Sequence, residues 1–189
     1  TTTPVATTAP VPTAILGTQS SSLMLTPIVG VRYGQTLNLV SRERPKHFDV
    51  HQEVSSSLIA WGPGIVYSRL LRIKSGQDVE SPSLVVECDL CQSWEQIAPD
   101  KFRFLLRDDI RWHDVPPTHG RKLTSRDVAY SYKRQMTPEW PNAVLLSSID
   151  SINVIDEHTI DISLKVLDSD FFIALADGHS KIVAQEVVE

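Results

Sequence analysis

The chain has 189 residues, a formal net charge of −5, 41% hydrophobic residues and 22% charged residues. These proportions are typical of a globular domain with one sizeable core, and the mild acidity argues against a nucleic-acid partner, which normally requires a basic patch. No apolar run reaches the roughly 18 residues that a membrane-spanning helix needs, and two cysteines are too few for a disulfide scaffold.

Threonine, proline, alanine and serine dominate the start of the chain. Residues 1–26 contain little that could pack, so we expect a disordered linker there and a folded domain over residues 27–189. Alternating apolar positions predict a first strand over Val29–Leu39. The sequence does not begin with Met, which is consistent with removal of an upstream segment.

A helix is expected within the next stretch, Ser55–Leu71, because Ile65, Val66, Leu70 and Leu71 recur at helical spacing. The Trp61-Gly-Pro-Gly64 sequence should prevent this helix from starting before Gly62 or Pro63. Further on, Gly76–Pro82 is expected to form a turn between two short strands.

Alternation of apolar and basic residues predicts a half-buried strand over Lys101–Arg107, with Lys101, Arg103 and Arg107 on the face opposite the phenylalanines. Its buried face should comprise Phe102, Phe104 and Leu106. A turn is expected at Pro116 and Pro117.

A helix is expected to begin after Thr124, which has Asp127 three residues later in the spacing of a capping box. It should end at Thr137-Pro138, since the residue before a proline is displaced from helical backbone angles. Its apolar face should comprise Val128, Ala129, Tyr132 and Met136.

The last part of the chain predicts a hairpin with arms over Ile152–Ile155 and Thr159–Val166, and Ile160, Ile162, Leu164 and Val166 should share one face of the second arm. A short helix carrying Phe171, Phe172 and Leu175 should follow Ser169 and Asp170 and stop at Gly178. Lys181–Val183 is expected to be a strand, and Glu186–Glu189 the start of a helix.

Two cysteines and two histidines allow an enzymatic interpretation. Cys88 and Cys91, with His113 and His119, could bind zinc or support thiol chemistry. The intervals between these residues do not match a zinc finger, and a predicted strand separates the two pairs. Two buried thiols or a disulfide are the structural alternatives.

The triplet Trp112-His113-Asp114 could in principle contribute a base and its orienting carboxylate to a hydrolase. Adjacent side chains on an extended segment point to opposite faces, however, and the sequence contains no nucleophile elbow. A structural turn is the favoured interpretation.

Seven short motifs stand in order between residues 89 and 132: Asp89-Leu90, Ser93-Trp94-Glu95, Phe102-Arg103-Phe104, Leu106-Arg107-Asp108, Ile110-Arg111-Trp112-His113-Asp114, Leu123-Thr124 and Asp127-Val128-Ala129-Tyr130-Ser131-Tyr132. The series closely resembles the signature of the family 5 extracellular solute-binding proteins, the oligopeptide, dipeptide and nickel receptors of bacterial ABC importers. This resemblance implies an α/β fold, namely a class II periplasmic-binding-protein-like lobe with a mixed β-sheet and packed helices, the N-terminal part of a two-lobed receptor.

The resemblance also implies a function without catalysis or a cofactor. Such a receptor would capture oligopeptides or other small solutes outside the membrane, at the periplasmic or extracytoplasmic face, and deliver them to ABC permease subunits. We expect a monomer that reaches the membrane only through an N-terminal lipid anchor, if one is present. A nickel complex, haem or an oligosaccharide are other possible ligands, and a truncated, non-transporting sensor module is an alternative to a receptor.

Two segments are candidates for contact with the solute. The resemblance implies that the residues before the first helix approach the ligand backbone, and that the loop after the capped helix lines the cleft. Serine hydroxyls suit a peptide main chain, and a tryptophan at a rim supplies stacking area. The candidate ligand-binding residues are Ser55, Ser56, Ser57, Trp140 and Asn142.

Overall fold

A computed structural model describes residues 34, 36, 38, 40, 41, 43–80 and 82–189. The linker expected over 1–26 and the strand expected over Val29–Leu39 therefore lie outside the described residues, apart from three isolated positions of the latter. The chain divides into two units, Thr1–Leu39 and Val40–Glu189. All the elements below belong to the second unit.

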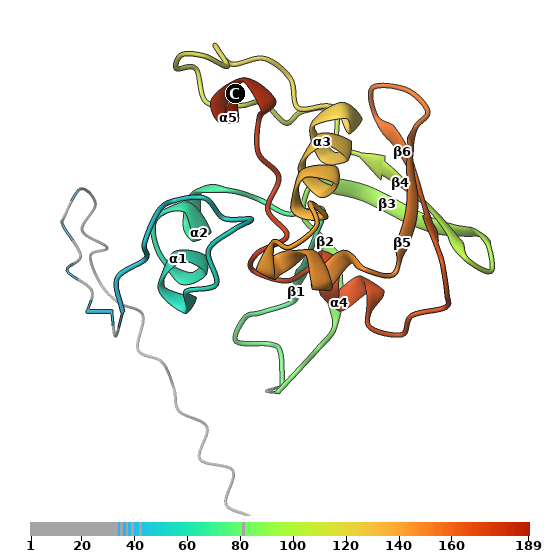
Figure 1. Cartoon of the computed structure of the whole chain (residues 1–189), viewed down its shortest axis with the longest axis horizontal. Helices are drawn as coiled ribbons and strands as arrows, with labels where there is room; N and C mark the ends of the chain where they lie inside the picture. Colours follow the sequence, from blue (N-terminus) through green and yellow to red (C-terminus); the bar gives the residue numbers. More distant parts are fainter. Residues whose placement is uncertain (1–33, 35, 37, 39, 42, 81) are drawn as a thin grey trace, which may run out of the picture. The chain divides into compact units, whose positions relative to one another are not determined.

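The larger of the two sheets in this unit is antiparallel and has four strands, which lie on the right in Figure 1. Its strands are β3 (Cys91–Ala98), β4 (Lys101–Leu106), β5 (Ile149–Val154) and β6 (Thr159–Leu164), arranged in the order β3-β4-β6-β5.

The alternation along β4 is confirmed, because Phe102, Phe104 and Leu106 are buried in the core on one face of the sheet. On the opposite face, Arg103 lies across from Asp161 of β6 and donates two hydrogen bonds to its carboxylate, at 2.8 and 3.0 Å. The period-2 pattern thus separates a hydrophobic face from a charged one.

The hairpin of β5 and β6 is also confirmed, with different ends. β5 begins at Ile149, and β6 ends at Leu164, which pairs with Ile149. The prediction that Val166 belongs to the second arm and shares the face of Leu164 is wrong, since β6 ends before it and its side chain is 65% exposed. Beyond Leu164 the Lys165 N–H donates to the Ser148 carbonyl at 2.8 Å, in the segment before β5 begins.

Helix α3 (Ser125–Gln135) confirms the predicted capped helix and lies beside the sheet in Figure 1, in contact with β5 and β6. Thr124 is the N-cap, and the Asp127 carboxylate accepts its backbone N–H at 2.9 Å, as part of a capping box. Val128, Ala129 and Tyr132 are buried against the sheet residues.

The helix expected to run to Leu71 is wrong in its extent. Two short helices stand there instead, α1 (Ser56–Ala60) and α2 (Pro63–Val66), separated at Gly62, whose φ is 56°. Helix α2 ends at Val66, and beyond it Leu70 and Leu71, both fully buried, lie in a bend and at the start of a strand. Two adjacent apolar residues fit a buried helix as well as a buried strand. Periodicity alone therefore cannot distinguish the two here.

Leu71 begins the short strand β1 (Leu71–Ile73), which pairs antiparallel with β2 (Val86–Cys88). The expected turn over Gly76–Pro82 lies between these two strands, as predicted. Together they form a second, two-stranded sheet.

Helix α4 (Phe171–Leu175) packs its two phenylalanines against Phe102, with ring centroids 5.3 and 5.1 Å apart. The helix ends at the C-cap Ala176, so the prediction of Gly178 as its stop is wrong. A side chain at Gly178 would lie 3.0 Å from Ile59, and close packing accounts for the glycine.

The remaining elements are the 3₁₀ helix η1 (Pro141–Leu146) and the C-terminal α5 (Gln185–Val188), which begins one residue before the helix start expected at Glu186. The strand predicted over Lys181–Val183 is wrong, because only a single bridge joins Lys181 to Arg69. Within the described residues, no helix is both long and apolar enough to cross a membrane.

Candidate functional site

Asn142 joins the loop after α3 to the segment in front of α1. Its buried side-chain amide donates to the backbone carbonyls of His51 and Glu53, at 3.0 and 2.9 Å. A buried amide that bonds two carbonyls of another segment fixes that segment's path. Asn142 therefore shapes the backbone that leads to the candidate serines.

The three serines differ in what they could offer a solute. Ser57 is buried, and its hydroxyl donates to the backbone carbonyl of Glu43 at 2.8 Å. Ser56 is exposed and donates to the Glu43 carboxylate at 2.8 Å, which lowers the pKa of Glu43. The Ser55 hydroxyl is buried and has no hydrogen-bond partner among the residues that the structure describes.

Trp140 lies against the last turn of α3. The Arg134 guanidinium carbon is 4.7 Å from the centroid of the Trp140 ring, a cation–π distance. The same guanidinium donates two hydrogen bonds to the Asp49 carboxylate. One face of the half-buried indole is thus covered by a cation that is itself anchored by an anion.

His51 lies beneath this pair and is fully buried. Arg134 is 3.0 Å from its Nδ1, and the Lys181 carbonyl oxygen is 2.8 Å from its Nε2. Arginine can only donate, so Nδ1 accepts and Nε2 carries the proton that is donated to Lys181. Burial lowers the pKa of His51, which keeps the ring in this neutral form.

The hydrogen bonds described above connect some of the predicted site residues to one another, but not all of them. Asn142 reaches the backbone of Glu53, two residues before Ser55, while no hydrogen bond between described residues links Trp140 to Ser55, Ser56 or Ser57. The sequence analysis did not identify the role of Arg134. A basic residue in the last turn of a helix is too common to point to a site.

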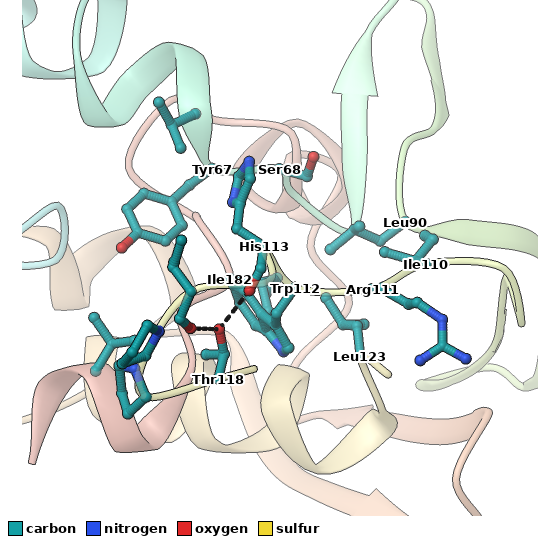
Figure 2. A pocket seen from close by; sticks show the side chains of 15 residues that line it. Tyr67, Ser68, Leu90, Ile110, Arg111, Trp112, His113, Thr118, Leu123 and Ile182 are labelled. Carbon is teal, nitrogen blue, oxygen red and sulfur yellow. Dashed lines mark hydrogen bonds between the residues drawn. The ribbon is translucent and has the colours of Figure 1, made fainter. Parts of the chain in front are cut away.

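A second feature is a cavity of about 260 Å³ (Figure 2). The segment between β4 and α3 forms most of its wall, together with the end of α2 and residues near the C-terminus. The imidazole of His113 lies between Tyr67 and Ser68 in Figure 2. The lining residues are mainly apolar: Val66, Tyr67, Ser68, Leu90, Ile110, Arg111, Trp112, His113, Val115, Pro116, Pro117, Thr118, Leu123, Ile182 and Val187.

The wall of this cavity is fixed by internal hydrogen bonds. The Thr118 hydroxyl donates to the carbonyls of His113 and Val115, at 2.9 and 3.1 Å. At the base of the loop, Arg121 donates to the carboxylates of Asp127 in α3 and Glu186 in α5. The bond from Arg121 holds the pKa of Glu186 down at about 2, so this link stays ionised above that pH.

Cys88 and Cys91 form a disulfide between the end of β2 and the start of β3. Of the two structural alternatives for these residues, the structure has the disulfide. An oxidised pair supplies no thiolates for zinc. Over residues 43–80 and 82–189, no three His, Cys, Asp or Glu side chains are grouped so that they could hold a metal ion.

Comparisons with known proteins agree with this fold. The family model described as bacterial extracellular solute-binding proteins, family 5 Middle, matches residues 85–188. The "HTH-type transcriptional regulator SgrR" of Pectobacterium atrosepticum is 36% identical over 98 residues, which are 52% of this chain and 16% of the regulator. "Heme-binding protein A" of Haemophilus influenzae is 27% identical over 140 residues, covering 66% of this chain and 24% of that protein.

Among solved structures, OppA of Burkholderia pseudomallei superposes with a TM-score of 0.61 and 23% identity, over 75% of this chain and 29% of that one. At this identity the likeness shows the fold alone. The fold is α/β and similar to that of periplasmic binding proteins, as predicted. The chain spans less than a third of the length of each of these three proteins.

Proposed function

Because the chain belongs to the bacterial extracellular solute-binding proteins of family 5, we propose that it is a substrate-binding component of an ABC importer. It captures a peptide or a related small solute outside the membrane and delivers it to the permease. The observation that carries this proposal is the match of the family over residues 85–188. The ligand is retained because it favours the closed form of the receptor, and no bond is made or broken.

The solute contacts in this proposal come from Ser55, Ser56, Ser57, Trp140 and Asn142. Ser56 supplies an exposed hydroxyl for a peptide main chain. Trp140 supplies an indole whose orientation is supported by Arg134. Asn142 acts through the backbone that it holds.

The protein's place in the cell is the periplasm or the extracytoplasmic face of the membrane. The disulfide between Cys88 and Cys91 supports this placement, since such bonds persist in oxidising compartments and are rare in the cytosol. A linker over 1–26, a domain over 27–189, a monomeric state and a lipid anchor are further parts of the proposal.

A second candidate function is solute sensing without transport. The 36% identity to a transcriptional regulator favours it. A regulator acts in the cytosol, where the two cysteines would be reduced. Trapping of free thiols in intact cells therefore separates the two candidates: an oxidised pair supports the exported receptor, and a reduced pair supports the sensor.

Thermal unfolding of this chain, and of any longer product of the same gene, tests the proposed function. The ligands to be screened are a short-peptide pool, nickel, haem and cello-oligosaccharides. A ligand at 100 times its Kd should stabilise the native state by about 2.7 kcal/mol. Trp140→Leu should abolish the shift, while Trp94→Leu, on strand β3, should retain it. No shift with any ligand on any form would contradict the proposal.

A further inference from the structure

We propose that the cavity in Figure 2 is a subsite for a single uncharged apolar group, a branched aliphatic or aromatic side chain. Assigning this group to the transported solute rests on the proposed function. The capacity of the cavity to bind such a group rests on its geometry alone. It is separate from the serine and tryptophan candidates, none of which lines it.

The size of the cavity limits the ligand to one group. An apolar cavity of roughly 150 Å³ holds a benzene ring, while pockets for whole drug-sized ligands begin at about 300 Å³. A volume of about 260 Å³ lies between these limits. It fits a substituted ring or a branched chain, with the rest of the molecule outside.

The apolar walls are preformed by segments that are far apart in the sequence. Leu90, Leu123 and Ile182 are buried and belong to the main core. Backbone hydrogen bonds hold them in place: Leu123 donates to the Ile110 carbonyl at 3.1 Å, and Ile182 donates to that of Ser68 at 3.0 Å. The Leu90 carbonyl accepts from Arg107 at 3.1 Å. Because the walls are ordered before a ligand arrives, binding carries no free-energy cost for ordering them.

The lining contains no acidic side chain, and its one permanently charged group is Arg111. Ser68 and His113 are both exposed. Arg111 extends away from the other labelled side chains and donates to the Gly120 carbonyl at 3.1 Å. A cation inside the cavity would lose its hydration without gaining a carboxylate, and the one charged partner for an anion, Arg111, extends away from the other lining side chains. The subsite therefore selects neutral groups.

Binding of small probes to the whole chain tests this inference. The probes are p-cresol, with 4-methylbenzoate and 4-methylbenzylammonium as charged compounds of similar shape. We expect saturable NMR shifts of the amides of Leu90, Ile110 and Leu123 with p-cresol. Both charged compounds should bind at least tenfold more weakly.

Two exposed serines provide a matched pair of variants. Ser68→Phe places a ring at the cavity and should weaken p-cresol binding at least tenfold. Ser75→Phe, in the turn between β1 and β2, should leave binding unchanged within twofold. Unfolding curves of both variants verify that each remains folded.

The inference is overturned if p-cresol does not saturate these shifts, if the charged compounds bind equally well, or if both serine variants behave alike. It is also overturned if a longer product of the gene no longer binds p-cresol, because a segment of the protein would then occupy the cavity. Binding of p-cresol without any solute-induced thermal shift would leave the subsite intact and remove only the proposed function.

Discussion

The Arg134 guanidinium donates two hydrogen bonds to the Asp49 carboxylate, at 2.9 and 2.5 Å. This ion pair ties the last turn of α3 to the segment that leads into α1. Both side chains are largely shielded, at 15% and 23% exposure. Removal of one partner from a shielded pair leaves the other poorly solvated, and this is more costly than the loss of a surface ion pair.

Arg134→Met should therefore destabilise the protein by roughly 2 kcal/mol, since Asp49 loses its partner and Trp140 its cation. The measurement is urea-induced unfolding at pH 7. Arg72→Met removes an ion pair with Glu87 that is more exposed than the pair of Arg134 and Asp49. This change should lower the free energy of unfolding by less than about 1 kcal/mol. Equal losses of unfolding free energy in the two variants would show that the Arg134–Asp49 pair stabilises the protein no more than a surface ion pair does.

The same ion pair predicts a dependence of stability on pH. Burial raises the pKa of Asp49, but hydrogen bonds from Arg134 and from the His51 backbone outweigh it, so that the pKa is about 2 instead of 3.8. A lowered folded-state pKa stabilises the protein above the unfolded value, and this stability is lost as the pH falls from about 4 to about 2.

The expected loss over this range is about 2 kcal/mol. Unfolding free energies of the wild type and of Asp49→Asn, measured from pH 6 to pH 2, isolate the contribution of this one group. Their difference should shrink as the pH falls. A difference that is constant over the whole range would refute the assignment.

Asn142 gives a third prediction. Asn142→Ala leaves the carbonyls of His51 and Glu53 without their donor, and unpaired buried groups of this kind cost about 1–3 kcal/mol. Asn153→Ala, at an exposed position of β5, should change stability by less than about 0.5 kcal/mol. Hydrogen exchange should also become faster over residues 50–57 in Asn142→Ala alone. Unchanged exchange there would mean that Asn142 does not hold this segment.

The elements that the sequence predicts well have strong local signals. The alternation along β4 and the capping box at Thr124 each depend on residues a few positions apart, and the structure contains both. The helical prediction fails at Leu71 because this residue pairs with Cys88 in the sheet of β1 and β2, and at Leu70 because its burial comes from packing in the core. Local periodicity carries no information on such pairing.

The candidate site was less predictable for a related reason. Arg134 and Asp49 are 85 positions apart, and Asn142 bonds to a carbonyl 91 positions away. A sequence pattern cannot reveal which distant segments meet. The resemblance to a family supplied Trp140 and the serines, whereas the ion pair that supports Trp140 required the structure.

The disulfide between Cys88 and Cys91 leads to the last prediction. The native protein should show no thiol that reacts with Ellman's reagent until a dithiol reductant is added, because both cysteines are oxidised. The bond closes a very short loop, so chain entropy predicts that its loss destabilises the protein by only about 2 kcal/mol. A variant with both Cys88→Ser and Cys91→Ser should therefore still fold and show that loss in urea. Stoichiometric zinc in the purified wild type, released together with two free thiols, would instead support the metal-dependent enzyme.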